Sequence, residues 1–168
     1  MESAAISTLD PREFRRALGH FATGVTVVTA EHGGKPFGAT ISAVSALSAE
    51  PPMVLVCLNQ NLGTHAAIQQ SGRFTINILS DEQGELARTF ATPNADKFVN
   101  AAWAATPHGP RLPEAIAHLS CRVVQTHEGG THRIFVGSVL QATTAADRGP
   151  LSYFRGQFGR FVPHDKAS

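Results

Sequence analysis

GATISAVSALSAEPPMVLVCLNQNLGT, at residues 38–64, holds the clearest structural signal in this sequence. Between Ala39 and Ala43, small apolar side chains alternate one by one with hydroxylated ones. A period of two is typical of a β-strand that has one apolar and one polar face. Because these side chains are small, the backbone groups of the strand stay accessible. We therefore expect a flat ligand to lie against this strand.

The second half of the segment predicts another strand followed by a helix. Pro51 and Pro52 favour an extended backbone, and the apolar run 53–58 then has the character of a strand. A polar turn leads to Thr64, which we expect to cap a short helix that ends near Gln70. The amide groups at a helix start attract anions. The ligand that this segment favours is therefore a flat ring with a phosphate tail.

The overall composition limits the class of protein. The chain has 168 residues, which suits one domain, placed at 1–168 with its core at about 10–161. The net charge is +1 without a cluster of Lys or Arg, which argues against nucleic-acid binding. No apolar run is long enough for a membrane span, and the first residues lack a secretory signal, so we expect a cytoplasmic protein. Charged residues make up only 16%, which favours a surface partly covered by another subunit or a ligand.

The segments on either side predict an antiparallel barrel. Asp10, Pro11 and Glu13 form a helix start, and the apolar stripe of this helix runs on until Gly24. Further strands are expected at 25–30, 74–79, 119–127 and 134–142, and a further helix at 81–90. Because turns join most of the strands, about six of them form a mainly β fold, an antiparallel barrel with three short helices.

The side chains offer little chemistry of their own. Cys57 and Cys121 each lie in an apolar strand, and we expect free thiols in the core. The sequence lacks the motifs of dinucleotide, phosphate-loop and serine-nucleophile sites. The histidines lack the spacing of a zinc site, so no metal is expected. If the protein is an enzyme, a cofactor must carry the reaction.

An ordered set of segments resembles the short-chain flavin reductase family. These segments are FATGVTVVTA (21–30), GATISAVSALSAEPPMVLVCLN (38–59), GTHAAIQQSGRFTINIL (63–79), LARTFA (86–91), DKF (96–98), GGTHRIFVG (129–137) and PLSYFRGQFGRF (150–161). The resemblance implies an antiparallel split β-barrel of the FMN-binding type. It also implies an NAD(P)H:flavin oxidoreductase that supplies reduced flavin to a partner monooxygenase, with FMN or FAD as flavin and NADH or NADPH as co-substrate.

The resemblance also implies a set of site residues. The flavin ring is expected along the backbone of Gly38, Ala39, Thr40, Ile41 and Ser42. The ribityl chain and phosphate are expected at Asn59, Gln60 and Thr64, with Phe90, Ala91 and Lys97 closing the phosphate side. The nicotinamide nucleotide is expected at His132, Tyr153 and Arg155. No side chain is expected to act as a catalytic acid or base, and His132 orients the nicotinamide.

Three positions depart from the pattern of many relatives. Those relatives have Ser-Ser at Ser42-Ala43, Ser-Thr-His at Gly63-Thr64-His65 and Gly-Asp-His at Gly130-Thr131-His132. The departures remove two hydroxyls and one carboxylate from the expected site. In relatives the site lies at a subunit interface, which implies a homodimer.

Simpler readings of the same residues stay open. Thr64 can be a helix cap without a phosphate, Lys97 a solvated charge and His132 a surface turn residue. The aromatic side chains near Tyr153 can serve packing alone. Asn77, which is polar within an apolar strand, is expected to be a buried amide whose hydrogen bonds are satisfied. Two alternative functions are a non-catalytic flavin-binding module and an oxidase of the pyridoxamine-phosphate type.

Overall fold

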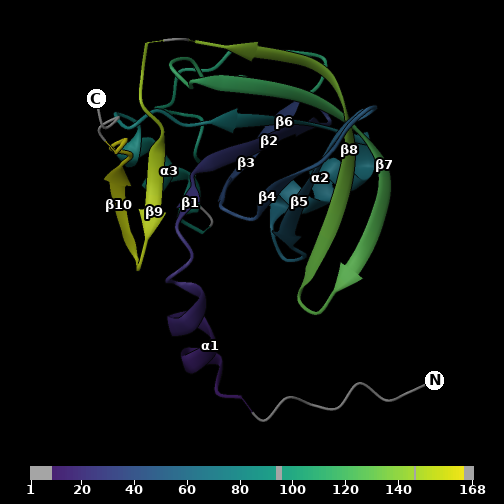
Figure 1. The fold of residues 1–168 in the computed structure, drawn as a ribbon. Coiled ribbons are helices and arrows are strands. Elements are labelled where there is room, and N and C mark those ends of the chain that lie inside the picture. The colour runs from purple at the N-terminus through teal and green to yellow at the C-terminus, as the bar shows by residue number, and fades with distance from the viewer. Residues whose placement is uncertain (1–8, 94–95, 146, 165–168) are drawn as a thin grey trace, which may run out of the picture.

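The computed structural model describes residues 9–93, 96–145 and 147–164 (Figure 1). Three helices are described: α1 (Pro11–Leu18), α2 (Gly63–Ser71) and α3 (Gly84–Ala91). The strands are β1 (Thr23–Gly24), β2 (Thr26–His32), β3 (Lys35–Ile41), β4 (Val44–Ala49), β5 (Pro52–Asn59), β6 (Arg73–Ile78), β7 (Ala117–Gly129), β8 (His132–Thr144), β9 (Leu151–Phe154) and β10 (Gln157–Arg160).

Two antiparallel sheets make up the fold. The larger has seven strands in the order β3-β2-β6-β7-β8-β5-β4, and the smaller has the order β1-β9-β10. β3 and β4 lie at opposite edges of the larger sheet, although only Ser42 and Ala43 separate them in the chain. The three steps from Ile41 to Val44 span only about 10 Å, so the sheet must curl until its edges meet. No hydrogen-bonded ladder joins β3 to β4 in the described residues, which makes this a split barrel.

The predicted barrel and its three helices are confirmed, and the predicted number of strands is too low. Residues 44–49 form β4, which the sequence did not predict, because Val-Ser-Ala-Leu-Ser-Ala has few of the residues that favour strands. The tail at 151–160 forms the hairpin of β9 and β10, which was also not predicted. The strand that was predicted between Ala39 and Ala43 ends at Ile41. Ala43 is therefore exposed and is not part of an apolar strand face.

α1 begins as predicted, and it ends earlier. The carboxylate of Asp10 accepts a hydrogen bond from the backbone N–H of Arg12 at 2.8 Å. The helix ends at Leu18, and Gly19 caps it, so the prediction that it continues to Gly24 was wrong. None of its side chains is buried within this chain. In Figure 1, α1 stands apart from the sheets on the side where the chain begins.

The core has two parts. The first lies inside the curled sheet and is covered by α2, with Ile68, Phe74 and Phe135 fully buried there. The second lies around α3 and includes Leu79, Phe90, Leu112 and Leu151. Cys121 is buried in the first part, whereas Cys57 is only half-buried; both are free thiols, as predicted. None of the described helices has the length and hydropathy that a membrane span requires.

Candidate functional site

A cavity of about 760 Å³ lies at the start of α2, and we call it the α2 cavity. Its walls come from the end of β5, the first turn of α2, the middle of β3 and the irregular segment after α3. The lining residues are Pro36, Phe37, Gly38, Asn59, Asn61, Leu62, Gly63, Thr64, Pro93, Asp96, Lys97 and Phe98. Four of the predicted flavin-binding residues therefore share one cavity: Gly38, Asn59, Thr64 and Lys97.

The first turn of α2 gives this cavity hydrogen-bond donors. The helix begins at Gly63 with Leu62 as its N-cap, and no side chain caps it, so the prediction of Thr64 as the cap was wrong. The first hydrogen bond of the helix runs from the N–H of Ala66 to the carbonyl of Leu62 at 3.3 Å. The preceding N–H groups lack partners within the helix. Such groups, together with the helix dipole, favour a bound anion.

Thr64 adds a polar side chain to this turn. Only 3% of the residue is exposed, and its hydroxyl makes no hydrogen bond within the described part of the chain. The hydroxyl oxygen itself is not fully enclosed, so a group in the cavity can reach it as a hydrogen-bond partner. A threonine that lines a cavity without one is therefore placed to bind a ligand.

Lys97 supplies the positive charge of the α2 cavity. Its ammonium group donates hydrogen bonds to the carbonyls of Phe90 at 2.8 Å and Gly38 at 3.1 Å, which fastens the end of α3 to β3. Burial lowers the pKa of this lysine. Two of its three N–H groups are used in these bonds. The third remains for a ligand.

A close contact between β3 and α3 shapes the same wall. A Cβ added at Gly38 would lie 2.6 Å from Cε1 of Phe90, so only glycine fits there. The Phe90 ring is buried in the core, and this residue faces the site only through the carbonyl bound to Lys97. Edge-to-face contacts connect Phe90 to Phe98 at 5.0 Å and Phe98 to Trp103 at 5.7 Å between ring centres. Ala91 is exposed at the end of α3 and does not line the α2 cavity.

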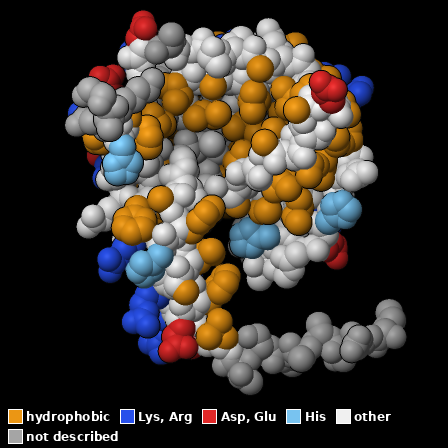
Figure 2. Space-filling model, viewed as in Figure 1, with side chains coloured by type: hydrophobic (Ala, Val, Ile, Leu, Met, Phe, Trp, Pro, Cys, Tyr) orange, Lys and Arg blue, Asp and Glu red, His pale blue; other side chains and the backbone are white. Residues whose placement is uncertain are grey.

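A second cavity of about 740 Å³ separates α1 from the barrel, and we call it the α1 groove. Figure 2 shows this hollow between α1 and the barrel, with hydrophobic side chains along it. Its lining residues are Arg15, Arg16, Leu18, Gly19, His20, Phe21, Thr23, Ser42, Ala43, Val44, Ser45, Leu55, Cys57, Tyr153, Arg155 and Gly156. The α1 groove thus brings together Ser42, which was predicted to contact the flavin ring, with Tyr153 and Arg155, which were predicted to contact the nicotinamide nucleotide.

The residues between these cavities contribute mainly backbone. Ala39 and Ile41 bury their side chains in the core, and the hydroxyl of Thr40 donates to the carbonyl of Ala87 at 2.6 Å. β3 is an edge strand, so one side of its backbone is free of sheet partners. This agrees with a ligand held by backbone groups.

Gln60 and His132 lie in a third place, at the turn between β7 and β8. The backbone N–H of Gln60 donates to the carbonyl of Thr131 at 3.1 Å, and its side chain donates to the carbonyl of His132 at 3.3 Å. His132 pairs with Asn59 across β8 and β5, yet it lines neither the α2 cavity nor the α1 groove. Within one chain, the structure therefore separates His132 from Tyr153 and Arg155.

Several lining residues were not predicted from the sequence. Pro36, Phe37, Asn61, Leu62, Pro93, Asp96 and Phe98 line the α2 cavity, and Cys57 lines the α1 groove. The polar turn before α2 was a signal for Asn61. The others are brought in by contacts between distant segments. Burial raises the pKa of the Cys57 thiol, which keeps it protonated near neutral pH.

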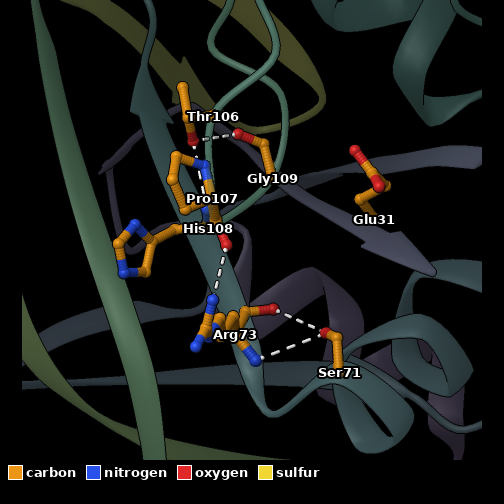
Figure 3. Close-up of a pocket in the computed structure, with 7 residues that line it drawn as sticks. All are labelled: Glu31, Ser71, Arg73, Thr106, Pro107, His108 and Gly109. Carbon is orange, nitrogen blue, oxygen red and sulfur yellow. Dashed lines mark hydrogen bonds between the residues drawn. The ribbon is translucent and has the colours of Figure 1, made fainter. Parts of the chain in front are cut away.

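A third hollow of about 250 Å³ shares no lining residue with these cavities (Figure 3). There Arg73 donates to the carbonyl of Pro107 at 3.3 Å and its backbone N–H donates to the Ser71 hydroxyl at 3.3 Å. The Thr106 hydroxyl donates to the carbonyl of Gly109 at 2.6 Å. These polar groups satisfy one another and attach an irregular segment to the end of α2. In the described residues no three His, Cys, Asp or Glu side chains are grouped to hold a metal.

Comparison with known proteins gives consistent matches along the chain. Residues 18–161 match the flavin reductase like domain. The chain is 60% identical over 167 residues to the reductase component of a 4-nitrophenol 4-monooxygenase/4-nitrocatechol 2-monooxygenase from Rhodococcus opacus, covering 99% of this chain and 90% of that protein. It is 39% identical to the FMN reductase (NADH) SmoA of Agrobacterium fabrum, covering 89% and 86%. The structure of the Streptomyces globisporus NADH:FAD oxidoreductase SgcE6 with NAD and FAD fragments superposes with a TM-score of 0.88 at 33% identity, covering 96% and 100%.

Proposed function

The chain belongs to the flavin reductase family, and we infer on this basis that it is an NAD(P)H:flavin oxidoreductase that supplies reduced flavin to a partner monooxygenase. The observation that carries this conclusion is the α2 cavity, where unbonded amide groups, the free hydroxyl of Thr64 and the ammonium of Lys97 converge. This donor set fits the phosphate of a flavin nucleotide. The names of the relatives supply the reaction and the partner class.

The overall reaction converts NAD(P)H, a proton and oxidised flavin into NAD(P)⁺ and reduced flavin. A flavin held in this site would supply the acceptor for the hydride of the reduced nicotinamide. The task of the protein is to hold the two rings about 3–3.5 Å apart. The backbone edge of β3 that has no sheet partner, together with Ser42 just beyond the strand, orients the flavin ring, and the first turn of α2 holds its tail. No side chain is needed as an acid or base.

We also propose a homodimer. α1 buries none of its side chains within its own chain, and Phe14, Leu18 and Phe21 are more than half exposed. An exposed apolar stripe of this kind favours contact with another protein surface. A second copy placed against α1 would also cover the α1 groove. It could bring the His132 of one chain toward the Tyr153 and Arg155 of the other. The cytoplasmic location stays a prediction.

A steady-state assay tests the function. Purified protein with NADH or NADPH and with added FMN or FAD should oxidise many equivalents of nicotinamide, followed at its absorbance band. Tight binding of flavin without turnover would instead identify a flavin-binding module. The four combinations of flavin and nicotinamide nucleotide also establish which pair this enzyme uses.

The assigned role of His132 gives a sharper prediction. We expect His132→Ala to raise the KM for the nicotinamide nucleotide by about tenfold, the loss of roughly one hydrogen bond to a ligand. The KM for flavin should change much less. His127→Ala, a change at an exposed histidine on the same hairpin, is the control. Equal effects on both KM values would refute the orienting role.

A further inference from the structure

A close contact between β3 and α2 defines one wall of the α2 cavity. A Cβ added at Gly63 would lie 3.1 Å from Cδ1 and 3.3 Å from Cε1 of Phe37. Both distances are shorter than ordinary van der Waals contact, so a side chain at position 63 requires the phenyl ring to shift by a few tenths of an ångström. The backbone of Gly63 is not in the left-handed region. The ring, and not the backbone conformation, is therefore what excludes a side chain.

The Phe37 ring has one direction in which it can move. It is half-buried and packs against the first part of the core, which leaves no free volume on that side. Its other side lines the α2 cavity. A side chain added at position 63 would push the ring away from the core and into the α2 cavity, which narrows the space beside the first turn.

We propose that Phe37 and Gly63 form a coupled pair that determines how strongly the α2 cavity binds the phosphate of a flavin nucleotide. This inference rests on the proposed function. With glycine at 63, the ring stays back, and the phosphate is bound by backbone amides and the Thr64 hydroxyl. With a smaller residue at 37, a serine at 63 would fit, and its hydroxyl would add a donor to the phosphate. The same substitution at 63 should therefore have opposite effects in the two backgrounds.

The effect should be confined to the tail of the ligand. Phe37 lies near the start of β3, whereas Ser42, at the expected ring end, follows five residues later, about 16 Å along an extended chain. Riboflavin has the ring and the ribityl chain without the phosphate. A general distortion of the site would weaken the binding of riboflavin and of FMN equally. A Phe37 ring shifted into the cavity beside the first turn should weaken the binding of FMN alone.

The test compares the dissociation constants of FMN and riboflavin, measured by flavin fluorescence, for the full chain and five variants. We expect Gly63→Ser to weaken FMN by about tenfold, the loss of roughly one charge-assisted hydrogen bond, with less than about a twofold change for riboflavin. Gly63→Ala should weaken FMN similarly. In the Phe37→Ala background, adding Gly63→Ser should tighten FMN binding.

Gly84→Ser is the matched control, because Gly84 is also the first residue of a helix and an added Cβ there would find its nearest atoms at 3.9 Å. It should leave both dissociation constants unchanged. Thermal melting of each variant without flavin identifies any that do not fold, and Phe37→Val then replaces Phe37→Ala. The proposal is overturned if Gly63→Ser in the native background lowers the dissociation constant of FMN. It is also overturned if this substitution raises the dissociation constants of FMN and riboflavin equally. If the unaltered protein neither binds nor reduces flavin, the proposed function itself fails.

Discussion

Asn77 shows how one buried amide fixes an irregular segment. Its Nδ2 group donates to the carbonyl of Val27 at 2.9 Å and the hydroxyl of Thr29 at 3.1 Å, and its Oδ1 accepts from the N–H of Leu112 at 2.9 Å. The side chain is fully buried. The prediction that Asn77 is a satisfied buried amide is confirmed. Its alternation with apolar neighbours indicated burial, and burial of an amide requires partners.

His118 makes the stability depend on pH. Burial is the main cause that holds its pKa below the usual 6.5, and the nearby Arg111 lowers it further. The carbonyl of Leu112 lies 2.8 Å from Nε2, so Nε2 carries the proton and Nδ1 accepts from Arg111 at 3.1 Å. Protonation of Nδ1 would remove that acceptor.

The direction of the pH effect follows from this depressed pKa. As the pH falls below about 6.5, the unfolded chain binds a proton before the folded chain does, and stability is lost. We expect the melting temperature to fall between about pH 7 and pH 5, and to fall less in His118→Gln. His127→Gln, at an exposed histidine, should keep the native slope. An unchanged slope in His118→Gln would contradict the prediction.

At the level of elements, the contact of β3 with α3 depends on the absence of a side chain at Gly38. We expect Gly38→Ala to lower the free energy of unfolding by about 2 kcal/mol, because an added methyl group must displace the buried Phe90 ring. Urea denaturation measures this. Adding Phe90→Leu should recover part of the loss.

Gly24→Ala is the control for this prediction. Gly24 is also a strand glycine, and an added Cβ there would meet no atom within 4 Å. A loss of stability at Gly24 as large as that at Gly38 would show that chain flexibility, and not the Phe90 contact, is responsible.

The sequence predicted the elements whose side chains alternate or repeat clearly. The strands at 53–58 and 74–79 are found almost as predicted, because each is apolar and bounded by turn residues. β4 was missed because Ser and Ala do not favour strands. Thr64 was mistaken for a cap because threonine is common there. The contact between Phe37 and Gly63 could not be predicted, since it depends on how two distant elements approach each other.

At the scale of the whole molecule, the exposed apolar stripe on α1 was predicted from the sequence only in part. The apolar spacing was recognised from the sequence, which did not indicate what the stripe packs against. The structure leaves Leu18 56% exposed. Within the described residues nothing buries this side chain, and a second copy of the chain is the cover that we propose, which is consistent with the low proportion of charged residues.

We expect Leu18→Glu to convert a dimer into a monomer. Light scattering after size exclusion should give twice 17.8 kDa for the unaltered protein and 17.8 kDa for the variant. Because α1 has no buried side chains, the variant should remain folded. Val99→Glu, at another exposed apolar residue, is the control and should stay dimeric. A monomeric unaltered protein would refute the homodimer.

The edge-to-face series of Phe90, Phe98 and Trp103 gives the molecule a natural optical reporter. Trp103 is the single tryptophan of the chain, and its neighbour Phe98 lines the α2 cavity. A flavin whose tail is bound there would bring its ring within range of energy transfer from the indole and would quench the indole emission. The occupancy of the cavity can thus be followed by ultraviolet fluorescence in the unlabelled, unaltered protein.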